Sequence, residues 1–382
     1  MVTWILTSSI LIGQLVKIPL GSVGGVTVLD VVVLSLCTIG LTRFKFKKIP
    51  IFFKSALLFI IIAIISLTFT PLKLEPEQYL ISFSYIIRFF SFILLGWLIY
   101  LGIFPNIKTE IVKILTYSGI GLAILGIMQF IFLPDMIFLQ KDGWDPHYFR
   151  TVSSFLDPNF LGAFMSLTLL LIMAMKNARM RFIFFVLVFI SLLTTFSRGA
   201  YLGFTVAFLT FSILNKSIKL LILTISLSVI LILSFMIYQN TVAAPKNIDR
   251  TQSAQYRYSS YQQGLAILEK HPLLGVGFNT YRFAISNYHL ADEEFLQSRG
   301  ASTNDSSLLF VAATTGVIGL IAYLLFLGSL LWIGWKKNLI LLAGLLGLTA
   351  QSFFANTLFY PHLLIWIILI AVISPSLEDQ KK

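Results

Sequence analysis

The chain consists of long apolar runs separated by short polar stretches, many of which contain proline or asparagine at the joint. An α-helix needs roughly 20 apolar residues to cross the hydrocarbon core of a bilayer, and proline or polar clusters usually mark where such a helix ends. The pattern therefore predicts an all-α integral membrane protein with about twelve transmembrane helices, several of them short. These helices are predicted at residues 3–16, 24–42, 51–71, 79–103, 110–133, 158–175, 181–196, 200–214, 218–238, 305–334, 338–352 and 355–374.

One long polar stretch interrupts this pattern between the ninth and tenth predicted helices. It covers residues 239–304 and is rich in aromatic and charged side chains, so we expect it outside the bilayer. The chain then divides into nine helices in residues 1–238, this hydrated segment, and three helices with a short tail in residues 305–382. A second polar loop, at 134–157, falls on the same side of the membrane if the predicted helices alternate in direction.

Inside the hydrated segment, the spacing of apolar residues predicts an amphipathic helix over about 255–270, which ends at His271 and Pro272. Its apolar stripe consists of four residues at helical spacing: Tyr258, Tyr261, Leu265 and Leu268. Such a stripe is expected either to lie at the membrane surface or to cap the helical bundle.

The composition agrees with a membrane protein, because 57% of residues are hydrophobic and only 12% are charged, against about 25% charged in soluble domains. The first apolar run has neither a basic leader nor a small-residue cleavage site, so we expect no cleaved signal peptide. The single cysteine, Cys37, excludes intrachain disulfides and cysteine clusters, and the four histidines lack metal-ligand spacing. We therefore expect neither a metal nor another cofactor.

The net charge of +12 is distributed unevenly between the two sides of the predicted helices. The loops on one side hold sixteen of the 28 basic residues and three acids, whereas the other side holds eleven basic residues and twelve acids. By the positive-inside rule, the basic side and both termini are cytoplasmic. The hydrated segment then faces the exterior, the periplasm of a bacterial inner membrane. Because the excess charge reports topology, we expect no nucleic-acid partner.

Arg88 and Asp30 are charged residues inside predicted helices, where a charge is costly and usually functional. They can form a structural ion pair with each other, or Arg88 can face a polar cavity. The sequence leaves both interpretations open.

Several arginines lie on the predicted exterior side. Arg198, at the end of a predicted helical hairpin, either extends its polar end to the interface or offers its guanidinium to a phosphate, which arginine binds through two parallel hydrogen bonds. Arg150, Arg257 and Arg282 lie on the same side. Each alone can be a solvated surface charge, but several beside apolar helices suit an anionic head group attached to a lipid. Together with Arg88, these three are therefore candidate substrate-binding residues.

Two aspartates lie at predicted helix starts. Asp157 followed by Pro158 is a helix-start signature, which a capped helix explains fully, although its backbone N–H groups can also help to hold an anion. Asp305 opens the tenth predicted helix. It can serve as the N-cap of that helix or, at the mouth of an arginine-lined cavity, as a general base.

Two spaced motifs resemble those of the O-antigen ligase/polymerase superfamily. The segment SRGAYL resembles its R-x3-L motif, with Arg198 and Leu202 on the two fixed positions. A second motif, H-[N/S/Q]-x9-G-x2-G, is matched in spacing by four residues: Asp305, Ser306, Gly316 and Gly319. The stretches HPLLGVGFN and RTVSSFLDPNFLG also look typical of these proteins, and the resemblance extends over almost the whole chain.

This resemblance implies a metal-independent, inverting membrane glycosyltransferase of lipopolysaccharide or other cell-surface polysaccharide biosynthesis. Its donor would be a glycan on undecaprenyl diphosphate at the outer face of the inner membrane. Its acceptor would be a hydroxyl of a glycan, of lipid A-core or of another molecule. The motifs assign Arg198 and Asp305 to catalysis, with arginines on the diphosphate and the carboxylate near the acceptor.

One position departs from the ligase motif, because Asp305 stands where the ligases have histidine. A carboxylate serves as a base near neutral pH only if its pKa is raised, and nearby arginines lower it. The resemblance therefore leaves open a ligase, a chain polymerase and a protein O-glycosyltransferase. From another class, a lipid or solute transporter with Arg88 and Asp30 on its pathway also remains. Two matching halves would favour the transporter, and a single exterior cap over an arginine-lined cavity would favour the enzyme.

Overall fold

The computed structural model describes most of the chain, namely residues 2–20, 24–44, 49–145, 147–244 and 250–373. Parts of three predicted features lie outside the described residues: the basic residues at 45–48, positions 245–249 of the hydrated segment, and the C-terminal tail from 374.

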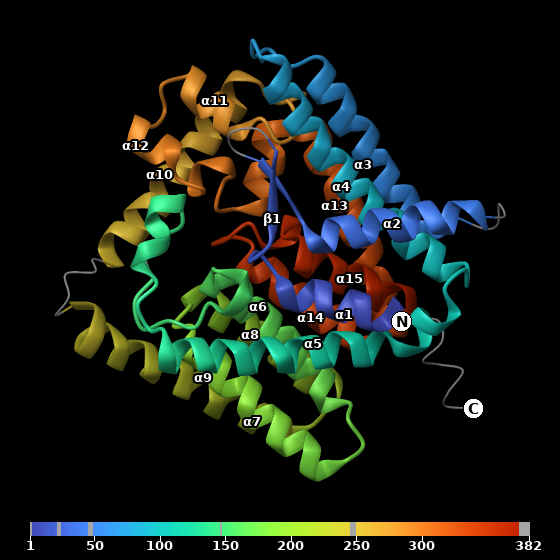
Figure 1. Cartoon of the computed structure of the whole chain (residues 1–382), viewed down its shortest axis with the longest axis vertical. Coiled ribbons are helices and arrows are strands. Elements are labelled where there is room, and N and C mark those ends of the chain that lie inside the picture. Colours follow the sequence, from blue (N-terminus) through green and yellow to red (C-terminus); the bar gives the residue numbers. More distant parts are fainter. Residues whose placement is uncertain (1, 21–23, 45–48, 146, 245–249, 374–382) are drawn as a thin grey trace.

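Each of the twelve predicted apolar segments contains a helix, and these helices form most of the molecule (Figure 1). The first six are α1 (Val2–Ile12), α2 (Val28–Thr42), α3 (Ile51–Thr68), α4 (Pro76–Tyr100), α5 (Pro105–Phe132) and α6 (Pro158–Met173). The others are α7 (Ala178–Thr194), α8 (Arg198–Leu214), α9 (Ile218–Tyr238), α13 (Ser307–Lys337), α14 (Leu339–Gln351) and α15 (Pro361–Ile373).

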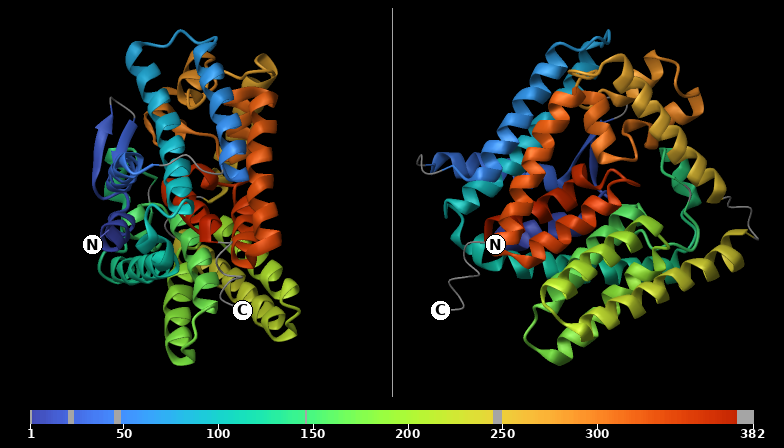
Figure 2. Two further views of the ribbon diagram at one scale, coloured as in Figure 1. Left: turned by 90° about the vertical axis from the view of Figure 1, so that its right-hand side faces the viewer. Right: turned by 180° about the vertical axis from the view of Figure 1, so that it is seen from behind.

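Five of the described helices are both long and apolar enough to cross a membrane: α3, α4, α5, α9 and α13. Shorter apolar helices complete the bundle, which makes the chain a multi-pass membrane protein. All thirteen residues of α15 are buried, and this helix lies in the middle of the molecule between the group formed by α3, α4 and α13 and the group formed by α5 to α9 (Figures 1 and 2). The core is therefore built around a short helix that is itself entirely apolar apart from His362.

The N-terminal region contains a β-hairpin that the sequence pattern did not predict. Strands β1 (Lys17–Leu20) and β2 (Gly24–Thr27) pair antiparallel, with Lys17 opposite Thr27. The prediction of a helix from residue 24 was wrong at its start, because Thr27 caps α2. Its hydroxyl accepts a hydrogen bond from the Asp30 N–H, and the Asp30 carboxylate accepts one from the Thr27 N–H, a capping box that begins the helix at Val28.

The hydrated segment contains α10 (Arg250–Lys270), α11 (Tyr281–Asn287) and α12 (Glu293–Gln297), which lie together beside α13 (Figure 1). The predicted helix over about 255–270 is confirmed. Two residues of its predicted apolar stripe are exposed, Tyr258 at 66% and Leu265 at 48%. Tyr261 and Leu268 are half-buried, and the Tyr261 hydroxyl donates to the Phe353 carbonyl after α14. The face of α10 that packs inward instead carries small or polar residues and one apolar side chain: Ser260, Gln263, Gly264 and Ile267. Contact of the stripe with the membrane surface stays a prediction.

A break in α13 joins the hydrated segment to the bundle. Gly316 has φ +67° inside the helix, and a Cβ there would lie 2.1 Å from the Leu273 carbonyl oxygen. The loop after α10 enters the gap: Gly277 N–H donates to the Thr314 carbonyl at 2.9 Å, and Val317 N–H donates to the Pro272 carbonyl at 2.8 Å. The glycine of the second motif is thus required by close backbone contact.

Candidate active site

Arg88 of α4 forms the ion pair with Asp30 of α2 that the sequence left as one of two interpretations. Its Nε lies 2.9 Å from Asp30 Oδ1 and its Nη2 lies 2.8 Å from Oδ2, a two-bonded geometry. Nη2 also donates to the carbonyl of Gly25 in the hairpin at 2.7 Å. Since Asp30 belongs to the cap of α2, one buried carboxylate fixes the hairpin, α2 and the orientation of Arg88.

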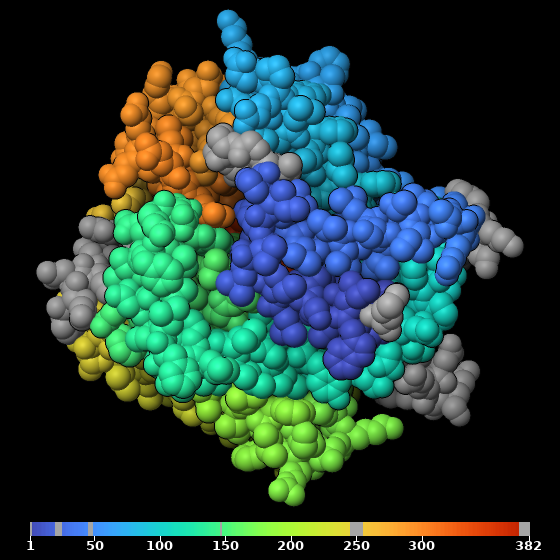
Figure 3. Space-filling model, viewed as in Figure 1, coloured from blue at the N-terminus to red at the C-terminus, as the bar shows by residue number. Residues whose placement is uncertain are grey.

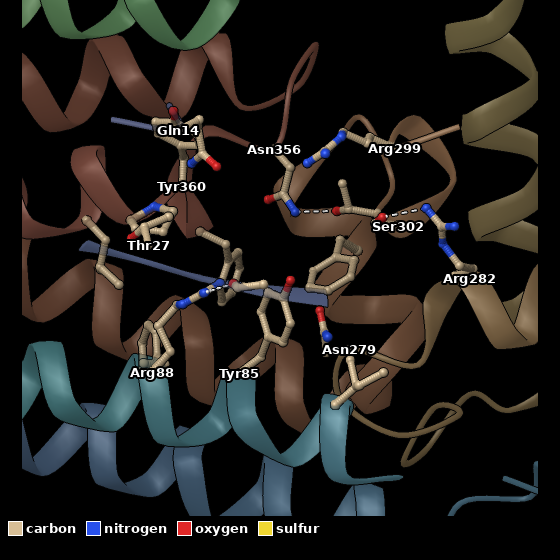
Figure 4. Close-up of a pocket in the computed structure, with 18 of the residues that line it drawn as sticks. Gln14, Thr27, Tyr85, Arg88, Asn279, Arg282, Arg299, Ser302, Asn356 and Tyr360 are labelled. Atoms are coloured by element: carbon tan, nitrogen blue, oxygen red, sulfur yellow. Dashed lines mark hydrogen bonds between the residues drawn. The ribbon is translucent and has the colours of Figure 1, made fainter. Parts of the chain in front are cut away.

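Arg88 also lines a cavity of about 240 Å³, so its ion pair does not exclude the second interpretation, which stays a prediction. The cavity lies where the hairpin, α4, the hydrated segment and the N-terminal ends of α6 and α15 meet (Figure 4). On the surface, the hairpin, the 134–157 segment and the hydrated segment come together on one face of the molecule (Figure 3). The site is therefore assembled from distant parts of the chain.

Four cationic side chains line this cavity: Lys17, Arg88, Arg282 and Arg299. None of the described lining residues is acidic, and Asp30 behind Arg88 is the carboxylate paired with this group. Burial, with the neighbouring guanidinium of Arg299, lowers the pKa of Lys17 to about 8. Arg88 adds to this effect, whereas Asp30 opposes it. Four cations that line one cavity suit an anionic ligand.

The two arginines that the hydrated segment contributes to the cavity are held by a backbone carbonyl, a hydroxyl and an aromatic ring. Arg282 donates from Nη1 to the Leu296 carbonyl at 2.8 Å and from Nη2 to the Ser302 hydroxyl at 2.8 Å. Arg299 lies over the Trp144 ring, with its guanidinium carbon 4.3 Å from the ring centre. Burial lowers the pKa of both guanidinium groups, yet arginine stays charged at any physiological pH. Two fixed cations therefore face the cavity from this side (Figure 4).

The remaining wall of the cavity combines hydrogen-bonding side chains with aromatic rings. Asn279, Ser302, Thr303 and Asn356 supply amides and hydroxyls, and Asn356 Nδ2 donates to the Thr303 hydroxyl. Trp144 and several phenylalanines supply the rings. Sugars present hydroxyl edges and apolar faces, so this wall suits a glycan next to an anion.

Asp305 does not cap α13, so the N-cap interpretation was wrong. The helix begins at Ser307, and Ser306 is the cap, with its hydroxyl accepting from the Leu309 N–H. Asp305 lies just before the cap, and its own N–H donates to the Ser260 hydroxyl of α10 at 3.1 Å. Its carboxylate is therefore not committed to the start of the helix.

Asp305 has the perturbed acidity that a general base requires. It lies two residues before the start of α13, and burial raises the pKa of its carboxyl to about 6. The Arg257 guanidinium opposes this shift, while the carboxylates of Asp145 and Asp157 add to it. Nearby arginines alone would lower this pKa, as predicted from the sequence. Burial and two like charges outweigh them.

The other predicted arginines do not line the cavity. Arg150 donates from Nε to the Thr195 carbonyl at 2.9 Å and from Nη2 to the Phe196 carbonyl at 3.4 Å, which ties the 134–157 segment to the end of α7. Arg198 is the first residue of α8, exposed, with its guanidinium 5.4 Å from the centre of the Phe235 ring. The structure thus brings Arg88 and Arg282 together and leaves Arg150, Arg198 and Arg257 elsewhere.

Asp157 caps α6 as predicted, accepting hydrogen bonds from the N–H groups of Asn159 at 2.6 Å and Phe160 at 3.2 Å. Phe160 lines the cavity, so this cap fixes one of its edges. Neither Lys17 nor Arg299 was among the site residues predicted from the sequence. The sequence feature that could have identified Lys17 is its position: it is a single cation between two apolar runs, on the predicted exterior side.

The helical bundle and its cavity define a class: a multi-pass membrane protein with a cation-lined, partly polar site. Residues 182–324 match the family described as O-Antigen ligase, and this part of the chain is an O-antigen ligase domain. The matched part includes Arg198, Arg257, Arg282, Arg299 and Asp305, whereas the hairpin and α4 lie outside it. No curated protein matches the chain. The matching family is that of O-antigen ligase/polymerase-type membrane proteins of surface polysaccharide biosynthesis.

Proposed function

We propose that the protein transfers a glycan from undecaprenyl diphosphate to the hydroxyl of an acceptor, at the outer face of the bacterial inner membrane. The cavity lined by Lys17, Arg88, Arg282 and Arg299 carries this proposal. A lipid-linked diphosphate is the anion that suits this cavity best. Such a donor reaches the protein from the bilayer, and an arginine guanidinium binds two phosphate oxygens through parallel hydrogen bonds. The O-antigen ligase domain supports a glycan as the transferred group.

The proposed reaction divides the site into two parts. Arg88, Arg282 and Arg299 hold the diphosphate, and the polar and aromatic wall holds the first sugar. The acceptor hydroxyl lies near Asp305, which does not itself line the cavity but follows the wall residue Thr303 by two positions. Arg198, exposed at the start of α8, is a further proposed contact of the donor outside the cavity. Arg150 and Arg257, which do not line the cavity, remain further proposed contacts of the donor.

In the transfer step, the acceptor oxygen attacks the anomeric carbon from the face opposite the diphosphate. The bond between that carbon and the phosphate oxygen breaks, and its electron pair leaves with undecaprenyl diphosphate. The acceptor proton passes to the Asp305 carboxylate. Configuration at the anomeric carbon is therefore inverted. Fixed cations contribute most where negative charge grows on the leaving group, so they stabilise the transition state more than the bound donor.

The choice between ligase and polymerase depends on the acceptor. Asp305 in place of the ligase histidine favours a reaction other than transfer to lipid A-core, and a second lipid-linked glycan as acceptor would make the enzyme a chain polymerase. A transporter receives less support, because the hydrated segment forms one cap that places Arg282 and Arg299 in the cavity.

An in vitro assay tests the proposal. Purified protein in nanodiscs is given one undecaprenyl-diphosphate-linked glycan together with lipid A-core, with a second lipid-linked glycan, or with an acceptor peptide. Elongated product in one arm, with release of undecaprenyl diphosphate, would support glycan transfer and identify the acceptor class. Movement of intact donor across the membrane without cleavage would instead support the transporter.

A further inference from the structure

We propose that Lys17 is a catalytic residue of this transfer: its ammonium group contacts the leaving diphosphate and stabilises the charge that appears there as the glycosidic bond breaks. This inference rests on the proposed function. It concerns a residue of the N-terminal hairpin, outside the part of the chain that matches the O-antigen ligase family.

The hairpin is built to bring Lys17 into the cavity. Lys17 pairs with Thr27 across the two strands, and its side chain passes over Gly25 of the partner strand. A Cβ on Gly25 would lie 2.0 Å from Lys17 Cε, so only glycine leaves room for this path. The Gly25 carbonyl in turn accepts the hydrogen bond from Arg88 Nη2. The same short strand therefore positions the lysine and anchors an arginine of the site.

Negative charge grows in this cavity as the glycosidic bond breaks. In the lipid-linked donor each phosphate carries one negative charge. Cleavage frees the terminal phosphate, which gains a further charge because the second pKa of a phosphate monoester is about 6. Asp30 pairs with Arg88 and the Asp142 carboxylate acts on Arg299, whereas Lys17 lies among these arginines as a further cation. A cation that contacts the freed phosphate therefore stabilises the leaving diphosphate more than the intact donor.

Lys17 is the cation whose charge can be removed by pH. Its ammonium faces Arg299 of the hydrated segment, Arg88 of α4 and Asp30 of α2, and these surroundings with burial set its pKa near 8 in the unliganded protein. The charged form is the proposed active form. Its contribution is therefore complete well below pH 8 and is lost as the pH rises through 8, whereas the arginines stay charged throughout.

The test compares wild type with Lys17→Met and Lys17→Arg, and uses Lys73→Met as a control for an exposed exterior lysine. Initial rates with a lipid-linked glycan donor give kcat and KM for each protein. Removing one fixed group that stabilises transition-state charge typically costs about 10²–10³-fold in kcat. We expect a loss of this order for Lys17→Met with a smaller change in donor KM, and substantial recovery in Lys17→Arg.

The pH profile provides a readout that a merely structural lysine would not change. We expect kcat/KM of wild type to fall above about pH 8, because this quantity reports the free enzyme. Lys17→Arg should lose this alkaline decline. Wild-type kcat in Lys17→Met, or the same alkaline decline in Lys17→Arg, would overturn the role of Lys17 while leaving glycan transfer intact. Failure of the proposed function itself would appear differently, as wild type that cleaves no lipid-linked donor.

Discussion

Replacing Asp305 by Asn removes one charge and leaves the shape of the side chain nearly unchanged. Because Ser306 caps α13, the substitution does not touch the helix cap. With a pKa of about 6, the carboxyl of Asp305 is mostly ionised at pH 7 and is still basic enough to accept a proton. Asparagine cannot accept it. A positioned base contributes about 10²–10⁴-fold in rate, and we expect transfer by Asp305→Asn to fall by that factor.

The same substitution has the opposite effect on stability. The pKa of Asp305 is raised from 3.8 to about 6, so the folded protein loses stability as the pH rises through this range. At pH 7 to 8 the ionised carboxylate is a cost, bounded at about 3 kcal/mol by the size of the shift. Asp305→Asn should therefore have an equal or higher melting temperature than wild type at this pH. Lower activity together with unreduced stability separates catalysis from folding.

The assay measures the transfer rate at saturating donor, with donor binding measured in parallel and melting followed in detergent. Wild-type kcat/KM should fall below about pH 6, where Asp305 becomes protonated, and Asp305→Asn should lose that acidic limb. Asp305→His should recover part of the rate if the position provides a base. A transfer rate for Asp305→Asn equal to that of wild type would refute the role of Asp305 as the general base. The substitution leaves the helix cap unchanged, so no other effect is expected to raise the rate.

Three further predictions concern Arg198, the break in α13 and the topology. Arg198→Lys keeps the charge but loses the planar fork, so we expect most transfer activity to disappear with normal membrane insertion; activity near wild type would leave Arg198 as an interface residue. Gly316→Ala should lower the melting temperature and the yield strongly, because a Cβ meets the Leu273 carbonyl, whereas Gly328→Ala in the same helix, with no atom within 4 Å of its Cβ, should not. A cysteine at Gln297 should react with an impermeant thiol reagent in spheroplasts, and one at Lys337 only after permeabilisation; the reverse order would contradict the proposed orientation.

The sequence predicted those parts of the fold that depend on local signals. Apolar run length located the twelve helical segments, and the pair Asp157–Pro158 located the start of α6, because each signal is contained within a few neighbouring residues. The β-hairpin escaped prediction because its strands are four residues long and continue directly into the apolar pattern of α2. Such short strands have no periodicity that distinguishes them from the end of a helix.

The candidate site was predictable only in part, because it depends on long-range packing. Arg88 was identifiable from the cost of a charge within an apolar run. The convergence of Lys17 with Arg299 was not, since these residues come from opposite ends of the sequence and meet only in the folded chain. The pKa of Asp305 likewise reflects burial and the sum of several charges. Its direction reversed the expectation drawn from arginines alone.

The most direct test of the account is the affinity of the cavity for a lipid diphosphate. Binding of a polyprenyl-diphosphate-linked glycan to the protein in nanodiscs would be compared for wild type, Arg299→Gln and Arg179→Gln, the last an exposed arginine outside the cavity. A hydrogen bond to a charged group contributes about 1.5–3 kcal/mol, so Arg299→Gln should weaken binding by roughly 10- to 150-fold. Arg179→Gln should bind as wild type does, and the matching neutral polyprenyl glycan, without the diphosphate, should bind poorly to all three proteins. Equal binding of the diphosphate donor to wild type and Arg299→Gln, or equal binding of the neutral glycan, would contradict the claim that this cavity holds the donor diphosphate.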